Sequence, residues 1–318
     1  MGIEQIHEDL DFIDNYVAYV DEAANFIKSQ LDSIGSTTPE FGVVLGSGLG
    51  DLAKEISDAK IIPYKDIPHF PRPTVEGHAG DMYVGSLEGV PIIGLSGRKH
   101  YYEEATRIKN AGILNVVFPV HVLANLGVKN YFVTNAAGGL NLKYNVGDTM
   151  VIDSHINMIE NPLLGPVLDF KRVNDDNKVW RFQPMNEDYD NKLSYLLGRG
   201  FNNFANEHKD WNLKQFKGIY LALTGPTYET KGECIAFRDG FKVDAVGMST
   251  APEVIVAKNR GMRVVGMSCV TNKIGLDGVN ATNHDEVKAI LESTRVRESL
   301  SGIVRNFFAL YRESKLRN

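Results

Sequence analysis

The sequence predicts one α/β domain in which helices cover both faces of a largely parallel β-sheet. Strand-like apolar segments alternate with helical segments throughout the last third of the chain, as in parallel sheets whose strands are connected by helices. No internal repeat, low-complexity stretch or linker divides the 318 residues, a length that a single α/β domain commonly reaches.

The composition indicates an ordinary globular protein and does not exclude a small anionic substrate. The net charge of −6 argues against nucleic-acid and anionic-membrane partners, which require a basic surface. The two cysteines, Cys234 and Cys269, give neither a disulfide framework nor a metal-ligand pattern. We find no signal peptide and no apolar stretch that would cross a bilayer, and therefore expect a cytoplasmic protein without membrane partners.

The first half of the chain begins with helical spacing up to about Ile34, which Gly35–Pro39 interrupts. We treat residues 1–40 as an N-terminal helical extension of a single domain spanning residues 1–318. The elements expected next are a strand at Phe41–Leu45, a hairpin of Met82–Leu87 and Pro91–Leu95, a helix within Thr106–Leu126, and strands at Asn130–Val133 and Thr149–Ile152.

The second half begins with the polar segment Leu163–Pro184, which we interpret as a long surface loop. Capping-box spacing marks three helix starts, at Thr230, Thr250 and Asn283. The expected helices are Glu187–Phe204, Thr230–Asp239, Ala251–Arg260 and His284–Tyr311, and the expected strands are Ile219–Leu223, Val243–Val246 and Arg263–Val270.

Small residues follow two of the expected strands and favour ligand binding there. Val133–Asn141 (VTNAAGGLN) ends a strand with little side-chain bulk, so a ligand can lie against the backbone N–H and C=O groups. The segment GSGLG at Gly46–Gly50 also follows a strand and is expected to open a helix, a suitable context for an anion site to which Ser47 would add a hydroxyl. A tight turn is the competing interpretation, because GSGLG fits neither the dinucleotide fingerprint nor the P-loop.

The segment Gly97–Glu103 (GRKHYYE) carries a second group of candidates. On an extended backbone, Arg98, His100 and Tyr102 would share one face and offer groups suited to a phosphate and a neighbouring hydroxyl. Glu103 would orient the His100 imidazole or keep it protonated through the proximity of its negative charge. A solvated polar edge strand is the alternative, and His78 is explained equally well as a turn residue.

Three further strand ends supply polar and aromatic groups. Tyr228 and Glu229 offer an aromatic face beside a carboxylate, which suits a flat heterocycle with an N–H donor. Ser249 precedes a capped helix and is placed to donate to an anion, whereas Met248 is either core filler or a ribose contact. The Asn272 amide both donates and accepts, and His284 at a helix N-terminus suits a sugar hydroxyl.

With these residues assembled, the chain resembles the trimeric purine nucleoside phosphorylases from about Phe41 to Glu286. The stretch Asp244–Ala257 carries the most specific part of the resemblance. The motifs that occur in the family's order are GSGLG, VEGHAG, GRKHYYE, VTNAAGGLN, NVGD, HIN, NPLLGP, GPTYET, DAVGMSTAPEVIVA, TNK and NHDEV.

The resemblance implies a mixed, partly barrel-like central sheet flanked by helices, a homotrimer, and phosphorolysis of inosine- or guanosine-type nucleosides, with inorganic phosphate as co-substrate and no metal or other cofactor. It implies phosphate contacts from Ser47, Arg98, His100, the Ala136 N–H and Ser249, ribose contacts from Tyr102, Met248 and His284, and base contacts from Ala137, Gly138, Tyr228, Glu229, Val246 and Asn272. Asn272, His100 and Glu229 would be catalytic, with His78 and Glu103 in support.

Two departures from the family pattern concern segments near the site. Met158–Glu160 is shorter than in members whose aromatic residue there reaches the neighbouring subunit's ribose, and Glu104–Asn115 is longer than the usual connection. The alternatives to the proposed activity are a nucleoside-binding sensor without turnover and methylthioadenosine phosphorylase. The latter generally has an aspartate where Asn272 stands and an apolar residue where His284 stands.

Overall fold

The strands form one mixed sheet. The computed structural model describes residues 2–33, 38–46, 48–74, 80–166, 168–170 and 181–316. Within these ranges the strands are β1 (Phe41–Leu45), β2 (Ser57–Pro63), β3 (Asp81–Leu87), β4 (Val90–Ser96), β5 (Asn130–Gly139), β6 (Thr149–Asn157), β7 (Gln215–Ala222), β8 (Ala245–Gly247) and β9 (Arg263–Lys273). Their order is β2-β3-β4-β1-β5-β8-β7-β6-β9.

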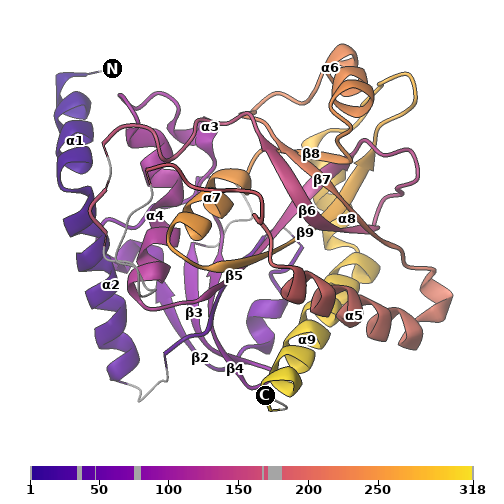
Figure 1. Ribbon diagram of the computed structural model, residues 1–318, viewed down its shortest axis with the longest axis horizontal. Coiled ribbons are helices and arrows are strands. Elements are labelled where there is room, and N and C mark those ends of the chain that lie inside the picture. The colour runs from indigo at the N-terminus through magenta and orange to yellow at the C-terminus, as the bar shows by residue number, and fades with distance from the viewer. Residues whose placement is uncertain are drawn as a thin grey trace.

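An additional pairing between β5 and β9 closes part of this sheet into a barrel. The closed ring runs β5-β8-β7-β6-β9, and β1 to β4 extend from β5 as an open sheet (Figure 1). Strand β5 lies parallel to β1 and β9 but antiparallel to β8, and β6 lies antiparallel to β9. The mixed, partly barrel-like sheet implied by the family resemblance is therefore confirmed. The largely parallel sheet expected from the strand–helix alternation holds only in part, since among the described strands five pairings are parallel and four are antiparallel.

Helices cover both faces of the sheet, as predicted. They are α1 (Ile3–Asp14), α2 (Tyr16–Asp32), α3 (Tyr101–Glu104), α4 (Ala111–Asn125), α5 (Asn191–Glu207), α6 (Lys231–Ile235), α7 (Ala251–Asn259), α8 (His284–Glu292) and α9 (Thr294–Leu316). Short 3-10 turns at Leu52–Glu55, Tyr64–Asp66 and Lys209–Trp211 and a π turn at Ala236–Gly240 complete the helical segments of the described chain.

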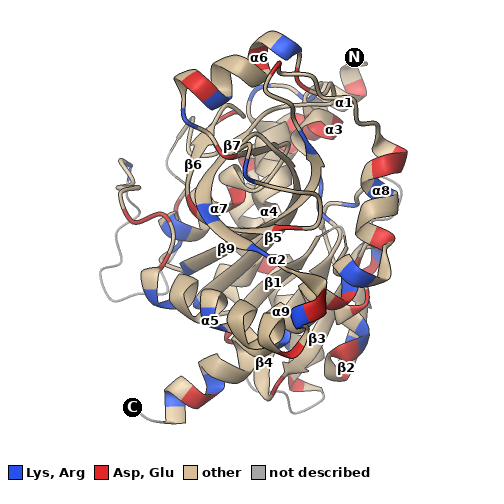
Figure 2. Cartoon of the chain, turned by 90° about the vertical axis from the view of Figure 1, so that its right-hand side faces the viewer, with Lys and Arg blue, Asp and Glu red and all other residues tan. Residues whose placement is uncertain are grey.

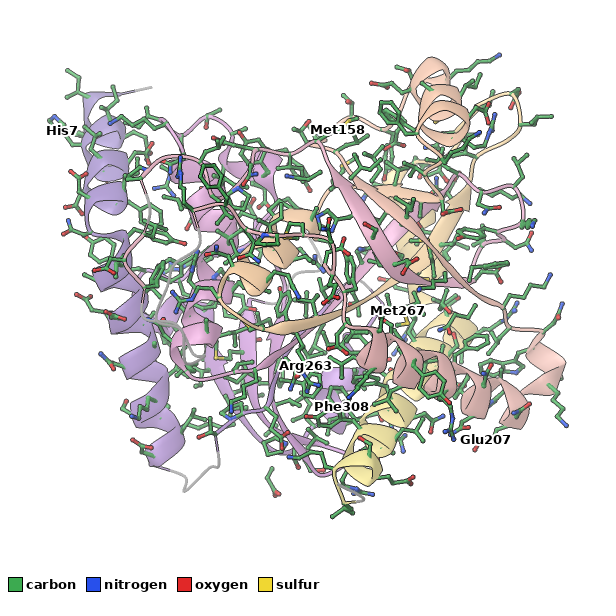
Figure 3. All side chains as sticks on the ribbon, viewed as in Figure 1. His7, Met158, Glu207, Arg263, Met267 and Phe308 are labelled. Carbon is green, nitrogen blue, oxygen red and sulfur yellow. The ribbon has the colours of Figure 1, made fainter. Side chains whose placement is uncertain are left out.

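Two large apolar clusters hold the helices against the sheet. Helices α1, α2, α4 and α7 pack on one face, and α5, α8 and α9 pack on the other (Figure 1). Neighbouring residues of β5 divide between the clusters because strand side chains alternate: Tyr131 joins the first and Phe132 the second. Figure 3 labels Met267 and Phe308, both buried in the second cluster, and Glu207, which is exposed on α5. Burial on both faces explains why the central strands read as apolar runs.

Several element boundaries differ from the predictions for local reasons. Strand β5 continues through Gly139, so the small residues lie within the strand and not after it. The expected helix at His284–Tyr311 is two helices, separated at Ser293, whose backbone is extended (φ −62°, ψ 137°). GSGLG leads only into the 3-10 turn at Leu52–Glu55, and Tyr101–Glu104 is a helical turn where an extended strand was expected.

Charged side chains of both signs lie mainly on the peripheral elements, including α6, α8 and α9 (Figure 2). In the described part of the chain, no helix combines the length and apolar character that crossing a bilayer requires.

Candidate active site

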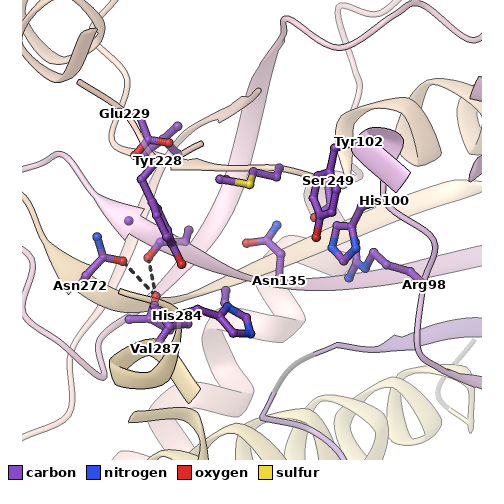
Figure 4. A pocket seen from close by; sticks show the side chains of 17 residues that line it. Arg98, His100, Tyr102, Asn135, Tyr228, Glu229, Ser249, Asn272, His284 and Val287 are labelled. Carbon is purple, nitrogen blue, oxygen red and sulfur yellow. Dashed lines mark hydrogen bonds between the residues drawn. The ribbon is translucent and has the colours of Figure 1, made fainter. Parts of the chain in front are cut away.

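One pocket gathers most of the residues singled out from the sequence. It opens where β5, β8 and β9 end and where α3, α8 and the segment before α6 approach them (Figure 4). The residues that line it are Arg98, His100, Tyr102, Asn135, Ala136, Ala137, Gly138, Tyr228, Glu229, Val246, Gly247, Met248, Ser249, Thr271, Asn272, His284 and Val287. Of the other predicted site residues, Glu103 contacts His100, whereas Ser47 and His78 lie outside the described residues.

The pairing of β5 with β9 shapes the floor of the pocket. Ala137 pairs with Val270, but Gly138 pairs with Asn272, so Thr271 is an extra residue in β9. Such a bulge changes the direction in which the following side chains point, and Thr271 and Asn272 both line the pocket. A Cβ at Gly138 would lie 3.1 Å from the Asn272 amide nitrogen, so glycine leaves room for that side chain.

A buried ion pair lies at one end of the pocket. Arg98 Nη1 donates to Glu253 Oε2 at 2.8 Å, and each side chain is 8% exposed. The same guanidinium donates to Thr250 Oγ1 at 3.2 Å and to the Thr134 carbonyl. Tyr131 holds the other carboxylate oxygen, with its hydroxyl 2.9 Å from Oε1. Because pairing and hydrogen bonds compensate both buried charges, Arg98 is held in a fixed orientation beside Ser249.

Thr250 links this ion pair to the neighbouring strand. The predicted capping box is confirmed, since the Thr250 N–H donates to Glu253 Oε2 at 3.2 Å. Its Oγ1 accepts from Asn135 Nδ2 at 2.9 Å and lies 3.1 Å from Ser249 Oγ. The residue has a positive φ of 76°, an unfavourable conformation for a β-branched residue that persists where surrounding contacts enforce it.

Glu103 holds His100 in place through one of its carboxylate oxygens. Glu103 Oε1 accepts from the His100 backbone N–H at 2.6 Å and lies 3.3 Å from the His100 Nδ1, while its Oε2 accepts from the Thr74 N–H at 2.8 Å. Burial alone would raise the pKa of Glu103, but these hydrogen bonds from His100 and Thr74 outweigh it and hold the pKa well below its usual range. Glu103 is therefore a carboxylate at neutral pH, which places a proton on His100 Nδ1.

Tyr102 lies beside His100 although the extended backbone expected for this segment is wrong. The two rings stack with centroids 5.2 Å apart and an interplanar angle of 11°. The helical turn α3 brings Tyr102 into the pocket, where burial, together with the charges of Glu103 and Tyr228, raises the pKa of its hydroxyl to about 12. The phenol is thus neutral at physiological pH and can both donate and accept a hydrogen bond.

The opposite end of the pocket carries an aromatic ring, a carboxylate and amides. Tyr228, Glu229 and Asn272 lie together there, at a distance from Arg98 and His100, with Asn135 between the two groups (Figure 4). Burial raises the pKa of Glu229, and hydrogen bonds from its own backbone and from Asn280 partly oppose the shift.

The helix that begins at His284 has the cap expected from the sequence, since the Asn283 side chain accepts from the Glu286 N–H at 3.0 Å.

Close packing at Gly225 completes the wall next to Met248. Gly225 has a positive φ of 64°, and a Cβ there would lie 2.4 Å from Met248 Sδ and 3.0 Å from the Tyr102 ring. Both the backbone conformation and the close approach therefore require glycine. Met248 lines the pocket, and its contact with a ribose stays a prediction.

Sequence reasoning missed several residues of the site. Glu253 was recognised only as a capping residue, and Asn135, Thr271 and Asn280 were not singled out. Asn135 is 6% exposed, and its Oδ1 has no hydrogen-bond partner although the atom is buried. Its place within VTNAAGGLN was the one signal that could have drawn attention to it.

Fold and site together define a class of protein, and comparison with known families agrees with it. The family model described as "Phosphorylase superfamily" matches residues 40–309. Purine nucleoside phosphorylase 1 of Bacillus subtilis is 43% identical over 293 residues, covering 92% of this chain and 98% of the relative. The Bos taurus purine nucleoside phosphorylase is 40% identical over 255 residues, covering 78% and 82%.

Solved structures give the same answer. A schistosoma purine nucleoside phosphorylase in complex with hypoxanthine superimposes with a TM-score of 0.76 at 33% identity, covering 91% of this chain and 96% of that one. A schistosoma enzyme in complex with guanosine gives 0.75 at 31% identity, covering 92% and 96%. The chain therefore belongs to the purine nucleoside phosphorylase family, and the predicted fold class is confirmed.

Proposed function

We propose that the chain is a pentosyltransferase that cleaves inosine- and guanosine-type purine ribonucleosides and 2′-deoxyribonucleosides with inorganic phosphate, a reaction of purine salvage. The products are the free base and (deoxy)ribose 1-phosphate. The observation that carries this proposal is one pocket with a fixed guanidinium, an imidazole and a serine hydroxyl at one end and a carboxylate–amide pair beside an aromatic ring at the other.

The Arg98 end is assigned to phosphate. Arg98, His100 and Ser249 carry side-chain donors at this end of the pocket, and the family resemblance adds the Ala136 N–H and Ser47. A dianion or monoanion of phosphate suits a guanidinium and an imidazole in a pocket that shields them from water. Glu103 would support His100 by holding the proton on Nδ1, and we assign His78 a supporting role as well. These groups would position phosphate for attack on the ribosyl C1′.

The Glu229 end is assigned to the purine. Glu229 would accept from the N1–H of a 6-oxopurine, and Asn272 would hydrogen-bond O6 and N7 as negative charge develops on the leaving base. Tyr228 and Val246 would cover the ring, while Ala137 and Gly138 leave room for it along β5. Stabilising the departing base more than the bound nucleoside lowers the barrier to C1′–N9 cleavage, which passes through an oxocarbenium-like centre.

The ribose would lie between these ends, next to Tyr102, Met248 and His284. The neutral Tyr102 phenol is suited to a sugar hydroxyl, and His284 is assigned to the 5′-hydroxyl. The catalytic groups proposed are thus Asn272, His100 and Glu229, with phosphate as co-substrate and no metal or other cofactor.

We further propose a cytoplasmic homotrimer in which residues 1–40 are a helical extension of the single domain. Exposed apolar side chains support self-association: Phe182 is 86% exposed and Leu164 53%, and both line one surface hollow. Sedimentation velocity tests this, with an expected mass three times the 35.3 kDa of the chain. A monomer at micromolar concentration would contradict it.

The activity itself is tested by hypoxanthine release from inosine, with phosphate present and then rigorously removed. Release that requires phosphate and yields ribose 1-phosphate is the expected result. Release without phosphate would identify a hydrolase and would contradict the assignment of Arg98 and His100 to phosphate binding. Binding of inosine without release under either condition would favour a nucleoside sensor, and a preference for methylthioadenosine would favour the other alternative.

A further inference from the structure

A loop asparagine connects the two polar residues at the base end of the pocket. Asn280 lies between β9 and α8, where its Oδ1 accepts from Asn272 Nδ2 at 3.0 Å. Its Nδ2 donates to Glu229 Oε2 at 3.3 Å. Asn280 therefore touches both Asn272 and Glu229 but is not among the residues that line the pocket.

A backbone donor fixes the direction of this chain of hydrogen bonds. The Thr282 N–H lies 3.4 Å from the Asn280 side-chain atom that also faces Asn272. Because a backbone N–H only donates, that atom is the amide oxygen, and the amide nitrogen faces the acceptor-only carboxylate of Glu229. Asn272 must then present its nitrogen to Asn280, and its own oxygen lies 3.1 Å from the Thr271 hydroxyl.

We propose that Asn280 is a positioning residue that makes this site specific for 6-oxopurines. This inference rests on the proposed function. A hydrogen bond from Asn280 favours the ionised form of Glu229, which accepts from the N1–H of a 6-oxopurine and repels the N1 lone pair of a 6-aminopurine. The second hydrogen bond holds Asn272 with its nitrogen on the side of Glu229, where that amide donates to a 6-oxo group but not to a 6-amino group.

Removing Asn280 weakens both constraints at once. Burial raises the pKa of Glu229 and the Asn280 hydrogen bond opposes that shift, so loss of the side chain raises the pKa further. A protonated Glu229 donates to adenine N1, and an Asn272 amide freed from Asn280 can turn its oxygen towards a 6-amino group. Both effects favour adenosine, so the preference of the site for inosine over adenosine should decrease.

The test compares wild type with Asn280→Ala and Asn280→Asp on inosine and adenosine. We expect Asn280→Ala to lower the inosine-to-adenosine ratio of kcat/KM by at least about tenfold, which corresponds to about 1.4 kcal/mol, the scale of one hydrogen bond to a charged group. Asn280→Asp keeps the acceptor for Thr282 and Asn272 but sets a carboxylate against Glu229. The acid limb of its pH–kcat/KM profile for inosine should therefore move to higher pH.

A matched control lies in the same loop. Asp277 Oδ1 accepts from the Val279 N–H at 3.1 Å, and Asp277 neither lines the pocket nor bonds to Asn272 or Glu229. Asp277→Ala loosens the loop in a comparable way and should leave the ratio at its wild-type value. An equal loss on both substrates in Asn280→Ala, or the same change of ratio in Asp277→Ala, would assign Asn280 a merely structural role and overturn the proposal.

Calorimetric titration of hypoxanthine and adenine keeps this inference separate from the proposed activity. If wild type releases no base from inosine, the proposed function fails, yet the preference for hypoxanthine over adenine can still be measured. We expect that preference to fall by about tenfold in Asn280→Ala. An unchanged preference in correctly folded Asn280→Ala and Asn280→Asp contradicts the role of Asn280 whatever the turnover.

Discussion

Replacing Arg98 with methionine would separate the stability of the site from its chemistry. The change leaves the Glu253 carboxylate in a position that is 8% exposed without the guanidinium 2.8 Å away. At an effective dielectric constant of about 20, two unit charges about 4 Å apart attract by about 4 kcal/mol. Breaking a buried pair by removing one partner costs about 3–5 kcal/mol. Because Tyr131 and Thr250 still donate to Glu253, we expect a loss near the lower end, about 3 kcal/mol.

Thermal unfolding measures that loss. A chain of 318 residues has an unfolding entropy of roughly 0.7 kcal/mol per kelvin, so Arg98→Met should lower the Tm by roughly 4–5 °C. The control is Arg98→Met combined with Glu253→Gln, which removes the uncompensated charge and should recover part of the Tm while phosphate-dependent release of hypoxanthine stays lost. A single variant with the wild-type Tm, or a double variant no more stable than the single one, would refute this account of the ion pair.

Three further changes test other parts of the site. Gly225→Ala would place a Cβ 2.4 Å from Met248 Sδ at a residue with a positive φ, which should cost about 1–3 kcal/mol of stability and raise the KM for inosine. Gly232→Ala is the control, because the space around that position is open and neither quantity should change. Thermal unfolding measures the stability and initial rates measure the KM. Because the pKa of Glu229 is raised and the proposed mechanism requires its ionised form to accept from the base, kcat/KM for inosine should decline on acidification at a pH above the ordinary glutamate value of about 4.3, and Glu229→Gln should lose this acid limb. Because the pKa of Glu103 is depressed in the folded state, its stabilisation is present above about pH 4.3 and is lost as the pH falls, so urea unfolding should find Glu103→Gln less stable than wild type at pH 7 and the two converging in acid.

Elements whose signals are local could be predicted from the sequence. The apolar run Phe41–Leu45 is β1 with the expected bounds, and helices begin after all three predicted caps. Thr230 and Thr250 form complete capping boxes, whereas in the described chain Asn283 caps its helix without the reciprocal bond from Glu286 to its backbone N–H. Strand β2 was missed because it is largely exposed and lacks the apolar alternation of a half-buried strand. The division of the last helical segment at Ser293 was also missed, since neither glycine nor proline stands there to indicate it.

The candidate site could be predicted only as far as its residues carry their own chemistry. Arg98, His100, Glu229 and Asn272 are polar groups near strand ends, and they line one pocket. Their partners could not be predicted in the same way, because a partnership between residues far apart in the chain is a tertiary contact. Glu253 is a capping residue by its spacing. It forms its ion pair with Arg98 only because α7 packs against β5 in the folded chain. The same holds for Asn280, which shows no motif of its own.

The position of the pocket follows from the pairing of β5. The first residues of β5 pair with β1 on one side and β9 on the other, but at Gly138 and Gly139 its partner opposite β9 is β8. Where a strand changes partners, its neighbours diverge and leave a crevice at its carboxyl end, and ligands bind in α/β proteins at such points. Here that crevice coincides with the lowest side-chain volume along β5 and with the bulge at Thr271, so the backbone is accessible where Asn272 turns inward. The small residues of β5 and the extra residue of β9 together therefore form a cavity that has Arg98 at one end and Glu229 at the other.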